Sequence, residues 1–150
     1  MVNPCNAKKV ADKVLEDFDD VCNALSIRYC LILGTCLGFY RDGGYIPRDN
    51  DIDVWVDCAL PRDRNFVALA KQLESMEFAR EGPRHFWRDG ILLDVWRIAS
   101  SATVAPLSFV ETFDTIVYNG RTYNLPHPVE GYLECKYGPD WKTLKPRRYR

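Results

Sequence analysis

The sequence predicts an α/β domain in which a mixed β-sheet is flanked by helices. Three observations predict this fold class: an early stretch with apolar residues spaced by three and four, several short apolar runs after it, and turn signals between those runs. The chain has 150 residues, of which 47% are hydrophobic, and this suits one ordinary domain. We therefore expect a minimal single domain over residues 1–150, with a core at about 6–141 and a basic tail at 142–150.

The first expected element is a long amphipathic helix over residues 3–26. Its polar face carries basic and acidic side chains, including Lys13, Asp17 and Asp20, and we expect that face to lie in solvent. The neighbouring acids at 17, 19 and 20 lack the glycine and the ligand spacing of a calcium loop. The apolar face is built from Val10, Ala11, Val14, Leu15, Phe18, Val21, Cys22 and Leu25.

The next expected elements alternate between strand and helix. Residues 28–33 form a short apolar run, typical of a buried strand, and residues 35–40 are expected to form a short helix behind Gly34. A turn over 42–47 leads to a second strand at 52–56, and Pro61 is expected to open the following helix.

The second half of the chain predicts two hairpins and a helix. Residues 84–87 and 91–98 flank a tight Asp-Gly turn, and residues 115–118 and 121–124 flank Asn119-Gly120, the strongest hairpin signal in the chain. A short helix at 129–137 is expected to end at Gly138-Pro139.

Composition excludes several classes of function. A net charge of −1 gives no overall field toward nucleic acid or an anionic membrane. No segment is apolar enough for a membrane span or a signal core, so we expect no membrane span and a cytoplasmic setting. The cysteines form no Cys-x-x-Cys pair, no metal-ligand spacing with histidine, and mostly lie in apolar surroundings; they are Cys5, Cys22, Cys30, Cys36, Cys58 and Cys135.

Three acids lie in or beside apolar strands and are the best candidates for chemistry. Asp51 and Asp53 are two residues apart, so in a strand they share one face and repel each other unless water or a cation lies between them. Asp94 lies inside the apolar run 91–96, where an acid needs a partner. If the two strands are neighbours, the carboxylates meet and suit Mg²⁺ or Mn²⁺, which takes further ligands from substrate phosphates. The alternative is a solvent-facing acidic strand edge with a separately neutralised Asp94.

Such a site favours displacement at phosphorus. Two metal ions can hold the attacking and the leaving oxygens of an in-line displacement. Gly34 and Thr35 are expected to offer a backbone N–H and a hydroxyl to a phosphate, and Arg41 or Arg48 to pair with it. Asp94 could serve as the base instead of as a ligand.

The two histidines are given no role in this chemistry. His85 is expected in an edge strand and His127 in a turn between prolines. No nucleophile and histidine accompany the acids in the way that a hydrolase triad requires.

One stretch of the chain reads Gly34-Thr35-Cys36-Leu37-Gly38-x-x-Arg41-x-x-Gly44-Tyr45-Ile46-Pro47-x-Asp49-x-Asp51-Ile52-Asp53. It closely resembles the signature of the LicD/fukutin family, which belongs to the polymerase β-like nucleotidyltransferase superfamily. The run 91–95 is similar to the strand that carries the family's third carboxylate. The run Tyr132-Leu133-Glu134-x-x-Tyr137-Gly138-x-Asp140-Trp141 is similar to the family's closing motif. The resemblance covers about residues 25–146 in patches.

The resemblance implies a nucleotidyltransferase-like fold and a metal-dependent phosphotransferase. Such an enzyme moves phosphocholine or a phospho-alditol from a CDP-activated donor to a hydroxyl of a sugar or glycan. Carried over by position, Asp51, Asp53 and Asp94 become the metal ligands, and Gly34, Thr35 and Arg41 become the donor-phosphate region.

The chain departs from the family pattern at two places, and because it is short we expect it to lack the inserts that typically build an acceptor site, which leaves the substrates open. The family often has Trp-Asp-Asp-Asp where this chain has Arg48-Asp49-Asn50-Asp51, and it often continues Ile-Phe-Pro where this chain has Val95-Trp96-Arg97. Two alternatives therefore stand beside the phosphotransferase. One is a nucleotidyltransferase that adds a nucleoside monophosphate to a small hydroxylated acceptor, and the other is a non-catalytic relative that binds nucleotide or metal.

Overall fold

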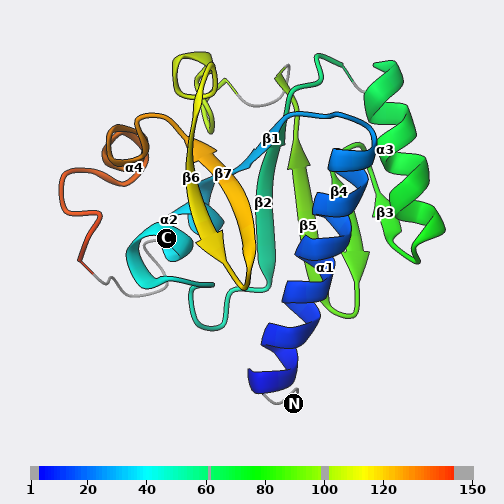
Figure 1. Cartoon of the computed structure of the whole chain (residues 1–150), viewed down its shortest axis with the longest axis horizontal. Coiled ribbons are helices and arrows are strands. Elements are labelled where there is room, and N and C mark those ends of the chain that lie inside the picture. Colours follow the sequence, from blue (N-terminus) through cyan, green and yellow to red (C-terminus); the bar gives the residue numbers. More distant parts are fainter. Residues whose placement is uncertain (1–3, 61, 99–101, 144–150) are drawn as a thin grey trace.

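A computed structural model describes residues 4–60, 62–98 and 102–143 (Figure 1). Its helices are α1 (Pro4–Ala24), α2 (Leu33–Asp42), α3 (Arg64–Ser75) and α4 (Val129–Tyr137), with a short 3₁₀ helix η2 (Leu107–Phe109). Its strands are β1 (Tyr29–Leu31), β2 (Asp51–Val56), β3 (Ala79–Glu81), β4 (His85–Arg88), β5 (Ile91–Trp96), β6 (Phe113–Tyr118) and β7 (Arg121–Pro126).

The main sheet has five strands in the order β1-β2-β5-β4-β3. Strands β2 and β5 pair in parallel, and the other neighbours pair antiparallel. Strands β6 and β7 form a separate two-stranded hairpin on the β1 side of the sheet (Figure 1). The predicted α/β class with a mixed sheet is confirmed.

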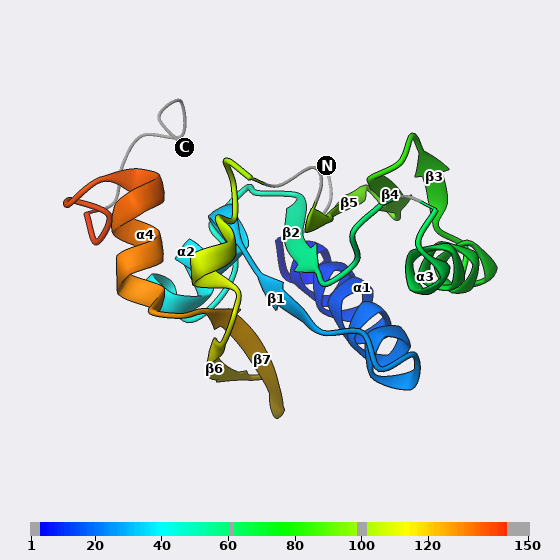
Figure 2. The same cartoon turned by 90° about the horizontal axis from the view of Figure 1, so that it is seen from above.

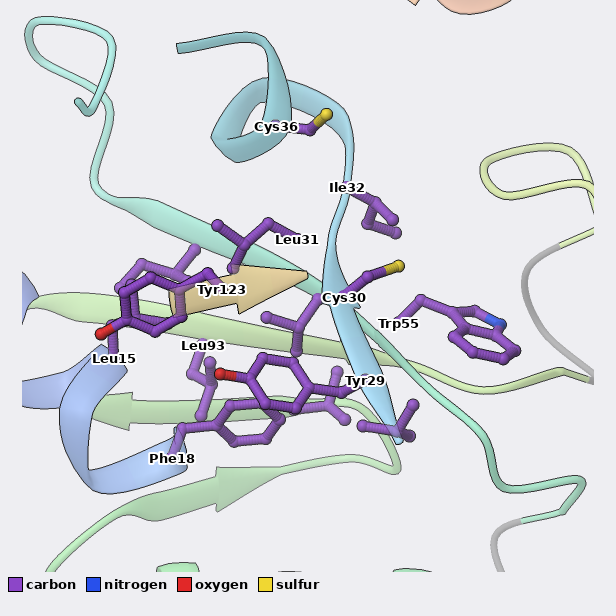
Figure 3. Close-up of a cluster of buried hydrophobic side chains, with 14 of the residues drawn as sticks. Leu15, Phe18, Tyr29, Cys30, Leu31, Ile32, Cys36, Trp55, Leu93 and Tyr123 are labelled. Carbon is purple, nitrogen blue, oxygen red and sulfur yellow. The ribbon is translucent and has the colours of Figure 1, made fainter. Parts of the chain in front are cut away.

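Helix α1 packs against one face of the five-stranded sheet, next to α3 (Figure 2). The core between α1 and the sheet contains aromatic and aliphatic side chains. The rings of Phe18 and Tyr29 pack edge to face with their centroids 4.9 Å apart, beside Leu93 (Figure 3). Along β2 the fully buried Ile52 and Val54 alternate with the half-buried acids. Because successive strand residues point to opposite faces, the acids lie on the face away from α1.

Both predicted hairpins form, and their turns have the left-handed backbone that a type I′ turn needs. The φ angles are 52° at Asp89 and 82° at Gly90, and 52° at Asn119 and 81° at Gly120. Asparagine, aspartate and glycine tolerate this region best, which explains why these dipeptides are reliable signals.

Several element boundaries differ from the prediction. Helix α3 begins at Arg64 and not at Pro61, which lies outside the described residues, because the Asp63 carboxylate caps the helix by accepting the Asn65 N–H at 2.9 Å. Helix α2 begins at Leu33, so Gly34 and Thr35 lie in its first turn. Strand β3 was not predicted, because its three residues are all exposed and show no alternation.

The prediction that the acidic face of α1 lies in solvent is wrong for Asp17 and Asp19, which are 4% and 7% exposed. Asp17 is held by Lys13 and Arg88, each at 2.8 Å. Asp19 accepts the Tyr29 hydroxyl at 2.6 Å and pairs with Arg121. Cations from distant strands neutralise these acids, and helical periodicity contains no information about such partners.

The single-domain boundaries stay a prediction, and most of the basic tail (144–150) lies outside the described residues. Cys22, Cys30, Cys36 and Cys58 are buried free thiols, as predicted from their apolar surroundings. Within the described ranges, no helix combines the length and the apolar character that crossing a membrane requires.

The Asp17 clamp yields a stability prediction. Although burial opposes ionisation, the hydrogen bonds and charges of Lys13 and Arg88 hold the pKa of Asp17 below its ordinary value. We expect Asp17→Asn to lower the free energy of unfolding at pH 7 by about 3 kcal/mol, because Arg88 is left without its buried counter-ion. The measurement is urea unfolding, with the exposed Asp20→Asn as control, which should cost less than about 1 kcal/mol.

The same clamp predicts a pH dependence. A carboxylate whose pKa is lowered by folding stabilises the protein above its unfolded pKa, and that contribution disappears as the pH falls through the folded value. The difference in the free energy of unfolding between the native protein and Asp17→Asn should therefore be constant at neutral pH and disappear below about pH 4. A gap that persists unchanged at pH 3 would contradict the ion-pair assignment.

Candidate active site

The parallel pairing of β2 and β5 brings the predicted acids together. Asp53 lies directly opposite Asp94, and Asp51 lies opposite Leu92. Paired residues of neighbouring strands point to the same face, so Asp51, Asp53 and Asp94 all project from the face away from α1. Strand β4 adds His85 to the same row, opposite Asp94.

The carboxyl group of Asp53 is buried beside other negative charges. Burial, followed by the negative charges of Asp94, Asp51 and Asp49, raises the pKa of Asp53 to about 8, and Arg84 only partly opposes this. A carboxyl group in such surroundings is stabilised when it is protonated or when a cation is bound beside it. The Asp53 carboxyl on β2 is therefore expected to be protonated or to have a cation beside it.

Asp94 has the partner that its apolar strand requires. Its Oδ1 lies 2.6 Å from Nε of Arg84 and 3.7 Å from Nε2 of His85. The guanidinium of Arg84 stacks on the Trp96 ring at 3.6 Å, which fixes its plane beside the carboxylate. Burial nevertheless raises the pKa of Asp94, since desolvation outweighs these cations.

The Gly34-Thr35 segment is joined directly to the acidic strand. The Thr35 hydroxyl accepts the backbone N–H of Asp53 at 2.9 Å, and the Ile32 N–H donates to the Asp53 carbonyl at 3.0 Å. The side chain of Thr35 is almost fully buried, so its hydroxyl positions β2. Contact of Gly34 and Thr35 with a phosphate stays a prediction.

Asp49 lies between the two segments, and sequence reasoning gave it no role. Its Oδ1 accepts the Asp51 N–H at 3.1 Å. Its Oδ2 would lie 3.2 Å from a Cβ at Gly34, so glycine leaves room for this carboxylate. The dense acidic run at 49–53 was the available signal.

The two arginines that were predicted to bind phosphate differ in their contacts and in their exposure. Arg41 forms a two-pronged pair with its neighbour Asp42, at 2.9 and 2.8 Å, and donates to the Trp141 carbonyl at 3.4 Å. Arg48 is exposed and has a left-handed backbone, with φ at 67°. The role of both arginines toward a phosphate also stays a prediction.

The donor set is chemically suited to a divalent cation, but its final arrangement is not preformed. Hard carboxylate oxygens are what Mg²⁺ and Mn²⁺ prefer, and the raised pKa of Asp53 reflects its burial beside other negative charges. Among the described residues, no three acidic, histidine or cysteine side chains stand close enough to hold a metal ion together. Asp51 and Asp53 are the first candidate ligands, and Asp94 would have to exchange Arg84 for the ion.

Residues 26–130 match the family model described as LicD/FKTN/FKRP, nucleotidyltransferase domain. The chain belongs to this family. Two curated relatives, ribitol-5-phosphate transferase FKTN of Homo sapiens and of Macaca fascicularis, are each 23% identical over 164 residues. The alignment covers 90% of this chain and 34% of each relative, so the chain spans about a third of their length.

A solved structure has a similar fold to this LicD/FKTN/FKRP chain. It is the crystal structure of an antigenic nucleotidyltransferase-like protein from Paracoccidioides brasiliensis, with a TM-score of 0.51 and 18% identity, covering 81% of this chain and 61% of the other. The likeness concerns the fold alone and agrees with the predicted nucleotidyltransferase-like sheet.

In this family member, sequence reasoning missed Arg84 and His85 as neighbours of the acids. Both lie in the hairpin partner of the Asp94 strand, and the pairing of His85 with Asp94 follows from the Asp89-Gly90 turn. Counting residues back from that turn would have found His85. Arg84 reaches Asp94 from beyond the strand end, which no periodicity predicts.

The contact between Thr35 and β2 can be tested by removing the hydroxyl alone. We expect Thr35→Val to lower the free energy of unfolding by about 1–3 kcal/mol, because the Asp53 N–H loses its acceptor in a poorly solvated place. Thr35→Ser keeps the hydroxyl and should lose less. Urea unfolding of the two variants checks this, and equal stability of Thr35→Val and the native chain would contradict it.

Proposed function

We propose that this chain is a Mg²⁺- or Mn²⁺-dependent phosphotransferase that moves a phospho-alditol or phosphocholine group from a CDP-activated donor to a hydroxyl of a sugar or glycan. The observation that carries the proposal is the placement of Asp53 opposite Asp94 on parallel neighbours, with Asp51 on the same face. Membership of the LicD/FKTN/FKRP family supports it, and so does the likeness to relatives named as ribitol-5-phosphate transferases.

The proposed roles follow from the positions of the residues. Asp51 and Asp53 hold the cation, which supplies positive charge to the donor diphosphate when it is bound. Thr35 keeps Asp53 in place through the backbone, and the small Gly34 leaves space at the first turn of α2. Asp94 either completes the ligand set or accepts the proton of the acceptor hydroxyl. Arg84 balances the charge of Asp94 in the metal-free protein.

A second candidate is a nucleotidyltransferase acting on a small hydroxylated acceptor, and the family description as a nucleotidyltransferase domain favours it. Both reactions use the same acids. They differ in which phosphorus is attacked, so the first releases CMP and the second releases pyrophosphate. A non-catalytic relative would release neither.

Product analysis separates these readings. The native chain is incubated with Mn²⁺, a sugar acceptor and one of CDP-ribitol, CDP-choline, CTP or ATP, and the expected result is CMP release from a CDP-linked donor. Asp53→Asn should lower the rate on the order of a hundredfold, because it removes a charge that the cation requires. Asp89→Asn is the matched control, since that residue is exposed in a turn that suits asparagine. Pyrophosphate release without CMP would overturn the proposal in favour of the second candidate.

Metal binding can be measured without turnover. Mn²⁺ at a hundred times its dissociation constant should raise the free energy of unfolding by about 2.7 kcal/mol, since the ion binds the folded chain only. Thermal or urea unfolding with and without Mn²⁺ checks this in the native chain, Asp53→Asn and Asp89→Asn. An equal gain in native protein and Asp53→Asn would place the metal elsewhere.

A further inference from the structure

A cavity of about 250 Å³ opens where β5 ends and the chain turns from β3 to β4. Its lining consists of two guanidinium groups, one imidazole, one carboxylate and one proline, contributed by Glu81, Pro83, Arg84, His85 and Arg97. Positively charged donors therefore predominate in a small, partly open cavity. This cavity adjoins the candidate active site through Arg84, which pairs with Asp94.

Arg97 forms the buried side of this cavity. It is only 5% exposed, although arginine is rarely buried to that degree. Its Nη1 donates to the Pro83 carbonyl at 3.1 Å, and its guanidinium stacks on the Phe66 ring at 4.7 Å. These contacts fix the plane of the guanidinium at the cavity.

Two further arginines, Arg84 and Arg80, lie close to Arg97. Arg84 stacks on Trp96, and Arg80 lies over the other aromatic neighbours, 5.8 Å from the Phe66 ring and 5.4 Å from the Phe86 ring. Burial, with the charges of Arg80 and Arg84, lowers the pKa of Arg97. Planar guanidinium groups match the oxygens of phosphate and carboxylate, so two arginines that line one cavity suit an anion.

The position of the cavity separates it from the predicted donor-phosphate region. Helix α2, with Gly34 and Thr35, contacts β2, whereas the cavity lies at β4 and β3 beyond β5 in the strand order. Asp94 stands between the two regions on β5. A group bound in the cavity would thus approach Asp94 from the side opposite the donor.

We propose that the cavity lined by Arg84, His85 and Arg97 binds an anionic group, a phosphate monoester or a carboxylate, carried by the acceptor substrate. The acceptor role rests on the proposed phosphotransferase function, whereas anion binding does not. The acceptor hydroxyl would then be held near Asp94 while its anionic group is held by the two arginines.

Anion binding is tested on the metal-free chain with inorganic phosphate as the probe, followed by calorimetry or ³¹P NMR at low ionic strength. Arg97→Gln should weaken phosphate binding about tenfold or more, and Lys71→Gln, which removes one charge from an exposed position of α3, should leave it unchanged. Acetate in place of phosphate shows whether a carboxylate also binds. Equal phosphate affinity in native chain and Arg97→Gln, or no binding by the native chain, would overturn the proposal.

Because Arg97 is buried, Arg97→Gln could fail to fold, which circular dichroism will show. Arg97→Lys then replaces it: it keeps the charge but loses the planar fork, and it should bind phosphate several-fold more weakly. A folded Arg97→Lys with native affinity would overturn the proposal equally.

The acceptor role is tested by adding a saturating CDP-linked donor with Mn²⁺. Unchanged phosphate binding supports a separate acceptor subsite, whereas displacement of phosphate assigns the cavity to the donor and overturns that role. If no donor binds or turns over while phosphate binding still depends on Arg97, the anion site stands and the phosphotransferase proposal, with the acceptor role, falls.

Discussion

The parallel pairing of β2 with β5 is the constraint on which the candidate site depends. These two strands are far apart in the sequence, and their register alone puts Asp53 beside Asp94. A shift of one residue would turn one acid toward the apolar core against α1, so the register is strongly determined by Ile52, Val54 and Leu93. The same hydrophobic packing that builds the core therefore builds the acidic face.

Gathering carboxylates on one sheet face costs stability, and the protein compensates for this unevenly. On the β5 side, Arg84 and His85 lie beside Asp94, and Trp96 supports the arginine. On the β2 side, the backbone of Asp53 is anchored to Thr35 and Ile32, and burial with the neighbouring negative charges raises the pKa of its carboxyl to about 8, which Arg84 only partly opposes. Such uncompensated charge is common where a site is organised for a ligand instead of for stability.

Long-range ion pairs also hold α1 in place, and they show where periodicity misleads. A helical pattern divides residues into an apolar and a polar face, and it predicts that polar residues meet water. Asp17 and Asp19 instead meet Arg88 and Arg121 from β4 and β7. The acids are polar as expected, yet they are buried, because distant strands bring the cations to them.

The sequence by itself determined the helices with regular apolar spacing, both tight hairpins, the alternation that puts Asp51 and Asp53 on one face, and the need of Asp94 for a partner. All of these depend on contacts between residues close in the chain or on the preferences of single residues. Only the tertiary structure decided that Arg84 is this partner, that Asp49 and His85 join the acids, and that Arg97 is buried beside a cavity. Those facts depend on which strands are neighbours and on where long side chains end. Packing between residues far apart in the chain determines the strand neighbours and the side-chain positions, and no local sequence pattern predicts this packing.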